Sequence, residues 1–388
     1  MHVLERRKRI FAYALNVLLY LLTLPFRFVQ NKTISLNTTK PKFLILRLDY
    51  IGDVLISTPV YHSLKEKFPG CKIVLICGSW AKSVVENNPY IDEIWTINCP
   101  WWSRARKDTI KKKSFISEYR KLFKRIKAEK FDVFIELRGD IRQTFLFGWL
   151  PHIPTRISND RSGGHFLLTH CVPYDFDLHE IKKNYQLLKS FAPIKEYEKP
   201  EVYHTDKDID IFNKFPIKKR YIVLFNGATA PLRRLQESKV IDLVQKLHKQ
   251  YQLQCIMAGG KEDVDRANKI NRVINDESIF LSLCGMISLI EVKVLINKAV
   301  LFIGIDSSVS HIAASSFTPA ISLYGPMLPE QVKPLGAEKR VLYHKYPCSP
   351  CLQTKCVVTG SFTEGQCMLD IQVEEILALT HNLLTNPA

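Results

Sequence analysis

The sequence lacks two signals that would assign it to common classes of protein. No G-x-G-x-x-G motif follows either of its two candidate first strands, where Gly52 and Gly227 stand alone. That motif cradles the pyrophosphate of a dinucleotide, so its absence argues against a dinucleotide-dependent oxidoreductase or sugar-nucleotide isomerase. The N-terminus also carries no cleavable signal with a small-residue cleavage site. We therefore expect a cytoplasmic, reducing compartment.

Acidic residues are scarce. The 388 residues include 38 acidic and 55 basic side chains, which gives a net charge of +17. This surplus favours an anionic partner: nucleic acid, a phosphorylated glycolipid or an anionic membrane face. The basic residues concentrate in residues 1–40 and 104–130, and the C-terminal half is closer to balance. We therefore expect no nucleic acid among the partners.

The N-terminal segment, residues 1–40, is short of apolar length. Four basic residues at positions 6–9 precede an apolar stretch of 17 residues, Ile10–Phe26. A full membrane span needs about 20 apolar residues. We favour a helix that lies in the membrane interface or re-enters it, anchored by its basic ends to anionic lipid. A single span is the alternative.

Two domains of alternating strands and helices are expected, at residues 41–195 and 196–388. Short apolar runs alternate with helical segments, which is typical of a parallel sheet in a Rossmann-like α/β domain. The expected strands of the first domain are Phe43–Arg47, Lys72–Cys77, Glu93–Ile97 and Phe131–Leu137. Those of the second are Tyr221–Phe225, Gln254–Ala258, Ile279–Leu283, Val300–Ile305 and Ala320–Leu323.

The stretch 42–59 organises the first domain. It reads as a strand, a glycine turn and a helix beginning at Val54, with Asp53 at the tip of the turn. Ligands of such sheets bind at the carboxyl ends of the strands, so Asp53 is placed to act on one. A helix cap is the alternative role, because Asp caps well. The pattern Arg47…Gly52-Asp53-Val54…Thr58-Pro59 resembles the N-terminal signature of glycosyltransferase family 9, the bacterial heptosyltransferases of lipopolysaccharide core synthesis.

The resemblance covers roughly residues 42–384. It implies the GT-B architecture, in which two Rossmann-like domains face each other across a cleft. It implies an inverting, metal-independent transfer of heptose from ADP-heptose to a lipopolysaccharide core or lipid A acceptor, without a cofactor. The partners would be a nucleotide-sugar donor and an anionic glycolipid at the cytoplasmic face of the inner membrane. Asp53 would be the catalytic base.

The donor side carries three further matches to the family. Asp306, Ser307 and His311 fit its Asp-Ser/Thr-Gly-x-x-His pattern, read as the diphosphate site, with Ser308 in place of the glycine. Backbone amides at a helix N-terminus bind phosphate, and a capped helix with a core histidine is the alternative.

Two more donor segments follow the same comparison. Thr229 and Arg233 match positions that neutralise the leaving diphosphate, although Leu235 replaces the usual tryptophan and plain surface charge is the alternative. Glu262 matches a contact to base or ribose. The nearby D-x-D at 263–265 sits at a helix start, so we expect Asp263 to cap that helix.

Arg138 and Arg142, which follow the strand at 131–137, are candidates for binding acceptor phosphate, and a structural ion pair is the equal alternative. A cysteine-rich loop at 348–367 contains Cys348, Cys351, Cys356 and Cys367. This spacing suits either a structural zinc or reduced thiols, and we favour thiols with no metal.

Two alternative functions remain open at this stage. One is a glycosyltransferase of the same fold with a different nucleotide-sugar donor. The other is a non-catalytic, membrane-tethered module that binds nucleotides or nucleic acid.

Overall fold

The computed structural model describes residues 6–26, 40–99, 112–336, 338–351 and 355–385. Residues 27–39 and 100–111, with most of the expected linker and part of the basic stretch, lie outside this range. Contacts divide the chain into unit 1, Met1–Glu198, and unit 2, Lys199–Ala388. This division falls three residues beyond the expected boundary at 195.

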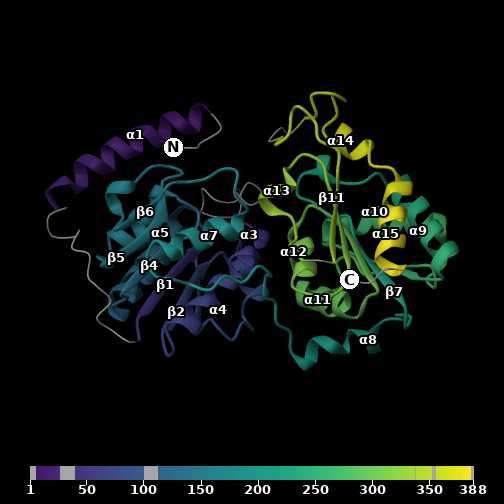
Figure 1. Ribbon diagram of the computed structural model, residues 1–388, viewed down its shortest axis with the longest axis horizontal. Coiled ribbons are helices and arrows are strands. Elements are labelled where there is room, and N and C mark those ends of the chain that lie inside the picture. Colours follow the sequence, from purple (N-terminus) through teal and green to yellow (C-terminus); the bar gives the residue numbers. More distant parts are fainter. Residues whose placement is uncertain (1–5, 27–39, 100–111, 337, 352–354, 386–388) are drawn as a thin grey trace. The chain divides into compact units, whose positions relative to one another are not determined.

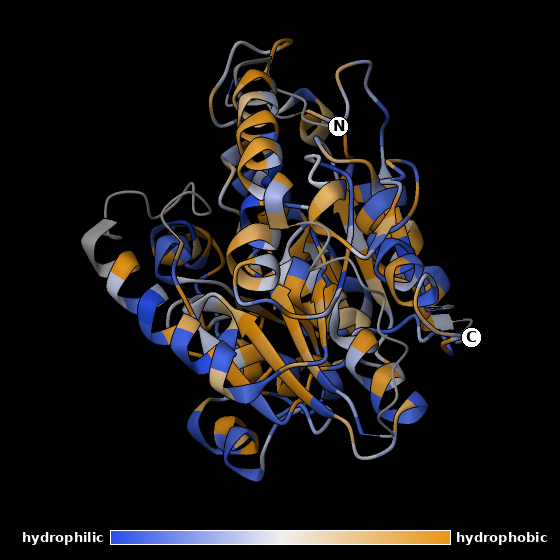
Figure 2. Ribbon diagram, turned by 90° about the vertical axis from the view of Figure 1, so that its left-hand side faces the viewer, coloured by the Kyte–Doolittle hydropathy of each residue, from blue (hydrophilic) through white to orange (hydrophobic). Residues whose placement is uncertain are grey.

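Unit 1 contains a parallel sheet. Within the described residues its strands follow the order β3-β2-β1-β4-β5-β6. They are β1 (Lys42–Arg47), β2 (Lys72–Cys77), β3 (Glu93–Thr96), β4 (Val133–Glu136), β5 (Thr155–Asn159) and β6 (His170–Val172). Helices lie around the strands in Figure 1. Burial on both faces explains why the central strands are continuous apolar runs, and Figure 2 shows the strands in hydrophobic colours.

Unit 2 repeats this topology. Its described strands are β7 (Tyr221–Phe225), β8 (Gln254–Ala258), β9 (Phe280–Ser282), β10 (Leu301–Ile305), β11 (Ala320–Tyr324) and β12 (Lys339–Tyr343). They run parallel in the order β9-β8-β7-β10-β11-β12. In both units the first and fourth strands are neighbours, and the chain winds outward from them in opposite directions. The expected α/β fold with two Rossmann-like domains is confirmed.

The helices cover both sheets. Unit 1 has α1 (Arg6–Thr23), η1 (Leu24–Phe26), α3 (Ile51–Ile56), α4 (Thr58–Lys67), η2 (Ser79–Val84), α5 (Lys112–Glu129), α6 (Ile141–Gln143), the π-helical η3 (Thr144–Trp149), η4 (His165–Leu167) and α7 (Glu180–Lys189). Unit 2 has η5 (Asp206–Asp210), α8 (Ile211–Lys214), η6 (Pro231–Arg233), α9 (Glu237–Tyr251), η7 (Lys261–Asp263), α10 (Val264–Ile274), α11 (Leu289–Lys298), α12 (Ser308–Ala314), α13 (Pro329–Val332), α14 (Gln366–Leu369) and α15 (Val373–Thr385). None of the helices in the described ranges is long and apolar enough to cross a membrane.

Three strands and one helix boundary differ from expectation. The sequence analysis missed β5, β6 and β12, which lie at or next to sheet edges and carry polar residues in place of an apolar run. The helix expected from Val54 begins at Ile51 and divides at Ser57, one residue before α4 begins with Pro59 in its first turn. Asp53 therefore lies inside the first turn of α3, and not at the tip of the preceding turn.

Candidate active site

In each unit the candidate residues follow the first and fourth strands. Asp53 follows β1 and Arg138 follows β4, while Arg233 follows β7 and Asp306 follows β10. The strand order reverses between these two strands in both sheets. The loops at such a reversal diverge and leave a crevice at the carboxyl ends of the strands, which is where open α/β sheets bind ligands.

Asp53 occupies the third position of α3 and closes its first turn. The backbone N–H of Tyr50 donates to Asp53 Oδ2 at 3.2 Å. The other carboxylate oxygen, Oδ1, lies 3.5 Å from Arg47 Nη2. The Asp53 side chain keeps 27% of its surface exposed. The capping role considered from the sequence is therefore real, and it leaves one side of the carboxylate open.

Arg47 is the buried cation of this site. Only 2% of its side chain is exposed, and its Nη1 donates to the carbonyl of Leu137 at 2.6 Å. Its Nε lies 2.9 Å from Asp49 Oδ2, and its Nη2 lies 3.5 Å from Glu180 Oε2. One guanidinium thus holds the end of β4 and faces three carboxylates, counting that of Asp53. The sequence comparison included Arg47 in its motif, but it gave Asp49 and Glu180 no role in the site.

The environment of Asp53 favours its protonated form. Burial, followed by the negative charge of Asp49, raises the pKa of Asp53 to about 6, against the opposing effect of Arg47 and Arg138. A carboxylate that titrates close to neutral pH is ionised at physiological pH and still basic enough to accept a proton. A pKa in this range allows Asp53 to accept a proton, and its hydrogen bond from Tyr50 shows that it also closes the turn.

Both candidate acceptor arginines pair with carboxylates. Arg138 Nη1 bonds Asp49, so Asp49 joins the turn after β1 to the turn after β4. Arg142 bonds Asp140 through two nitrogens, Nε at 3.0 Å and Nη2 at 2.6 Å. The structural ion pairs considered from the sequence are therefore present. Each arginine still keeps about a third of its side chain exposed, 27% for Arg138 and 32% for Arg142.

A buried carboxylate that the sequence analysis missed shapes the turn between these arginines. Glu136 is fully buried and accepts hydrogen bonds from the backbone of Gly139 at 2.6 Å and Asp140 at 2.9 Å, and from Ser158 Oγ at 2.8 Å. Gly139 has a φ of +82°, and a Cβ there would lie 1.8 Å from Asn159 Oδ1. Only glycine fits this position, and the only advance signal was a glycine following a strand that ends in Glu.

In unit 2 an ion pair joins the segments that follow the first and fourth strands. Arg233 Nη1, after the first strand, lies 3.0 Å from Asp306 Oδ2, after the fourth strand. Asp306 is buried, and burial raises its pKa although Arg233 opposes the shift. Arg233 keeps 32% of its side chain exposed. In unit 1 the paired carboxylate, Asp49, follows the first strand and the paired arginine, Arg138, follows the fourth, so the order of charges is reversed relative to unit 2.

Asn226 fixes the loop that carries Arg233. Its Nδ2 donates to the carbonyl of Leu235 at 2.9 Å, and its Oδ1 accepts the N–H of Leu235 at 2.8 Å. Arg266 Nη2 donates to the Asn226 carbonyl at 2.7 Å. The Leu235 side chain is buried in the core of unit 2, while Thr229 is exposed on the loop. The sequence analysis saw the loop but not this clamp.

The α12 segment follows the expected arrangement. Ser308 is its first helical residue, so a serine there needs no left-handed backbone. His311 is buried on the inner side of the helix. Ser307 Oγ is buried and has no hydrogen-bond partner among the described residues, which leaves a donor beside Asp306. The helix begins where the sequence predicts, and the role of these residues at a diphosphate stays a prediction.

Glu262 and Asp263 differ in their exposure to solvent. Glu262 is exposed on η7. Asp263 is buried and accepts the N–H of Gly260 at 3.1 Å, so its side chain closes the first turn of η7. It makes no capping hydrogen bond to α10, so the expectation that it caps that helix is wrong. The role of Glu262 at the base or ribose stays a prediction.

The four clustered cysteines surround one cavity of about 20 Å³. They are Cys348, Cys351, Cys356 and Cys367, and all four are free thiols. Although burial opposes it, hydrogen bonds from the Thr359 hydroxyl and from backbone N–H groups lower the pKa of Cys356 to about 7. Within the described chain, no three histidine, cysteine or acidic side chains are arranged to hold a metal ion. The expectation of reduced thiols without a metal stays a prediction.

Comparison with known proteins identifies similar sequences. A family model described as glycosyltransferase family 9 (heptosyltransferase) matches residues 119–361, which include the candidates from Arg138 to His311 but not Asp53. The chain is 27% identical over 293 residues to lipopolysaccharide heptosyltransferase 3 of Escherichia coli, covering 71% of this chain and 80% of that protein. It is 21% identical over 348 residues to lipopolysaccharide heptosyltransferase 1 of Pseudomonas aeruginosa, covering 87% and 94%.

Solved structures agree with these matches in fold. The E. coli ADP-heptose lps heptosyltransferase II superposes with a TM-score of 0.71 at 20% identity, covering 89% of this chain and 98% of that one. A glycosyl transferase family 9 protein from Veillonella parvula gives a TM-score of 0.73 at 20% identity, covering 89% and 97%.

Proposed function

This chain belongs to glycosyltransferase family 9 and is a glycosyltransferase of GT-B architecture, and on that premise we propose that it transfers heptose from ADP-heptose to a lipopolysaccharide core acceptor. The relatives named as lipopolysaccharide heptosyltransferases support the acceptor class, and a structural neighbour named for ADP-heptose supports the donor. The Asp53 carboxylate, with its pKa near neutrality at the strand reversal of unit 1, is the observation that carries a catalytic function.

We propose an inverting displacement with Asp53 as base. The acceptor hydroxyl gives its proton to the open side of the Asp53 carboxylate while its oxygen attacks the anomeric carbon of the donor. The bond from that carbon to the diphosphate oxygen breaks, and ADP leaves with the electron pair. Arg47 and Arg138 keep the carboxylate ionised before the transfer, and Asp49 keeps it basic.

The proposed leaving-group site is in unit 2. ADP gains negative charge as it departs, and a preorganised positive group near that charge stabilises the transition state. Arg233 can supply this charge because Asp306 fixes it from one side while 32% of its side chain stays exposed. Ser307 and Ser308 add donors beside it. Since protein groups supply this stabilisation, the proposal requires no metal ion.

Turnover with purified substrates tests this proposal. The full chain is incubated with ADP-heptose, or with a UDP- or GDP-sugar, and with a heptose-deficient lipopolysaccharide core, and the product is read by mass spectrometry. We expect a product from ADP-heptose alone. We expect Asp53→Asn to lower kcat by 10²–10⁴-fold, as removal of a general base does, and to leave ADP binding intact by calorimetry.

A matched control uses Asp265, an exposed carboxylate on α10 in unit 2. Asp265→Asn makes the same chemical change as Asp53→Asn and also removes the second acid of the D-x-D. Activity should stay at the wild-type level. A product from a UDP- or GDP-sugar would show that the donor is not ADP-heptose and would leave the proposed mechanism standing. Full activity of Asp53→Asn would show that Asp53 is not the base. The absence of both turnover and nucleotide binding would favour the non-catalytic alternative.

A further inference from the structure

The outer face of α1 and η1 is a continuous apolar surface. Ten large apolar side chains between residues 10 and 26 are exposed, from 41% for Tyr20 to 67% for Tyr13. They are Ile10, Phe11, Tyr13, Val17, Leu18, Tyr20, Leu21, Leu22, Leu24 and Phe26. Most other large apolar side chains of unit 1 are buried in its core, so this surface is an exception that needs a partner.

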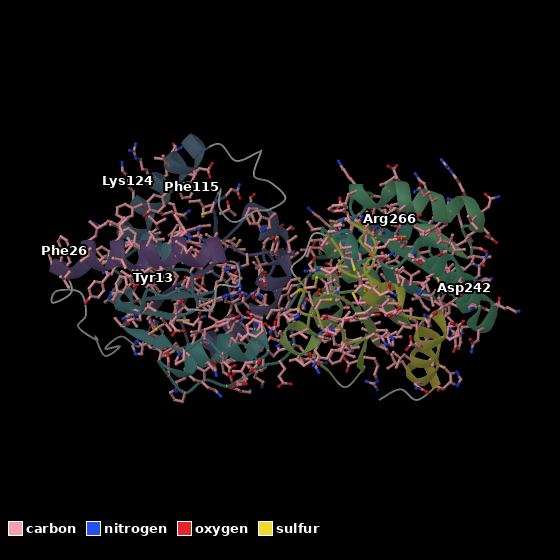
Figure 3. All side chains as sticks on the ribbon, turned by 90° about the horizontal axis from the view of Figure 1, so that it is seen from above. Tyr13, Phe26, Phe115, Lys124, Asp242 and Arg266 are labelled. Atoms are coloured by element: carbon pink, nitrogen blue, oxygen red, sulfur yellow. The ribbon has the colours of Figure 1, made fainter. Side chains whose placement is uncertain are left out.

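The inner face of α1 is packed as part of the protein. Leu19 is 6% exposed and joins a cluster with Trp149, Phe166 and Leu167. At the edge of the exposed face, Phe26 of η1 meets Trp149 edge-on, with ring centroids 6.3 Å apart. Figure 3, which looks down on unit 1, shows α1 running across it between Tyr13 and Phe26. The helix therefore lies along the surface of unit 1 with one face packed and the opposite face open.

Asn16 fixes this helix to one turn of unit 1. Its Nδ2 donates to the carbonyl of Ser162 at 2.8 Å, and its Oδ1 accepts the N–H of Gly164 at 2.8 Å. A Cβ on Gly163 would lie 2.2 Å from Asn16 Oδ1, so the turn is shaped to admit this side chain. The two bonds set the rotation of α1 about its axis, and hence which residues face outward.

The same turn reaches the candidate acceptor residues. Ser162 Oγ donates to the carbonyl of Gly139 at 2.7 Å and accepts the N–H of Ile141 at 2.9 Å. Gly139 lies between Arg138 and Arg142. Ser162 therefore connects the turn that binds Asn16 of α1 to the turn that carries Arg138 and Arg142.

Charge identifies the partner of this surface. Residues 6–9, at the start of α1, are all basic. Helix α5 packs against η3, the segment that Leu19 of α1 and Phe26 of η1 also contact at Trp149. The Tyr119 hydroxyl of α5 donates to the Leu146 carbonyl of η3 at 2.7 Å, and the exposed residues of α5 include Arg120, Lys121 and Lys124. An exposed apolar helix face, with basic residues at the start of the same helix and on α5, matches the acyl boundary and headgroups of an anionic bilayer.

We propose that α1 lies in the plane of an anionic membrane with its outer face in the lipid, and that Asn16 holds the turn carrying Arg138 and Arg142 at the membrane surface. Membrane binding stands independently of the reaction. The role of Asn16 in positioning the arginine turn rests on the proposed function, because it concerns a membrane-embedded acceptor.

Vesicle binding tests the first half. The full chain is sedimented with phosphatidylcholine vesicles that contain either no phosphatidylglycerol or about a third of it. We expect binding that needs the anionic lipid, and a loss of at least tenfold in Leu21→Glu. The control is Val273→Glu on α10, because Val273 and Leu21 have nearly equal exposure, 59% and 61%. Equal vesicle binding by Leu21→Glu and wild type would overturn the proposal. So would a wild-type dimer that does not bind vesicles and that Leu21→Glu converts to a monomer.

Turnover on two acceptors tests the second half. Asn16→Ala should bind vesicles within about threefold of wild type and should react normally with a water-soluble core fragment. It should lose at least fivefold in kcat/KM on the acceptor embedded in vesicles. An equal loss on both acceptors would show that Asn16 acts only on the fold of unit 1. A wild-type protein that binds vesicles without turning over either acceptor would refute the proposed function and leave the membrane surface standing.

Discussion

Replacing Asp53 with asparagine should stabilise unit 1 while it removes activity. The pKa of about 6 lies above the ordinary value of 3.8. Ionising Asp53 is therefore harder in the folded protein than in the unfolded chain. The group's favourable contribution to stability is complete below pH 3.8 and is lost as pH rises through 6. The amide oxygen introduced by Asp53→Asn would still accept the Tyr50 N–H, but the new side chain carries no charge at any pH.

The size of the effect follows from the shift in pKa. A shift of about two units at about 1.4 kcal/mol per unit gives about 3 kcal/mol. Because the side chain keeps 27% exposure, solvent screens part of this, and we expect a gain of about 1–2 kcal/mol in the free energy of unfolding above pH 7. Well below pH 3.8 the gain should vanish, since Asp53 is then protonated in both the folded protein and the unfolded chain.

Urea unfolding followed by tryptophan fluorescence measures this directly. All five tryptophans of the chain lie before residue 150, so the signal reports on unit 1. Asp177→Asn, at an exposed position of the same unit, is the control, and it should change stability by less than about 0.5 kcal/mol. A variant Asp53→Asn that is less stable than wild type at pH 8 would show that the ion pair with Arg47 outweighs burial. The assignment of Asp53 as a base with a raised pKa would then be wrong.

Three further predictions concern the two crevices. In Asp49→Asn, loss of the neighbouring negative charge should lower the pKa of Asp53, so the acid limb of the kcat/KM profile should move from near pH 6 to lower pH; an unmoved limb would contradict this. In Arg233→Ala, kcat/KM for the donor should fall about 10²–10³-fold, because the leaving diphosphate loses its cation, and added guanidinium should restore part of the activity. Unchanged kinetics would exclude this role for Arg233. The double variant Arg233→Ala with Asp306→Asn is the control, because it removes the buried carboxylate that Arg233→Ala leaves unpaired. In Gly139→Ala, the positive φ and the clash should lower the midpoint of thermal unfolding by several degrees, and a normal midpoint would show that the turn relaxes.

Much of the scaffold could be predicted because burial leaves a direct mark on sequence. β1, β7 and β10 are apolar on both faces, and continuous apolar runs of that length indicate strands in a parallel sheet. β5 reads Thr-Arg-Ile-Ser-Asn, and its arginine is buried by bonds to carbonyls of Ile153 and Leu167. Such a strand is buried through polar partners that only the folded chain brings together, so the apolar pattern missed it.

The site divides in the same way. Asp53 and Arg233 stood beside glycines or strand ends, so their place in a crevice followed from topology. The pairing of Asp49 with Arg138 joins residues 89 positions apart, and no spacing in the sequence reveals it. That pairing holds in place the Asp49 carboxylate, which raises the pKa of Asp53, and it engages the Arg138 guanidinium in a structural ion pair. The position of the candidate site could be predicted from the sequence, but the ion pairs that shift the pKa of Asp53 could not.

The bonds of Asn16 have a consequence for the timing of synthesis. Asn16 is 148 residues ahead of its partner Gly164. A ribosome that adds about 5–20 residues per second therefore makes α1 about 7–30 s before its seat has been made. During that interval the turn that binds Asn16 has not yet been made, so the inner face of α1 is not yet fully covered. Helix α1 is thus made well before the turn that it packs against, and under the proposed membrane binding a bilayer would be available to it before the rest of unit 1 is.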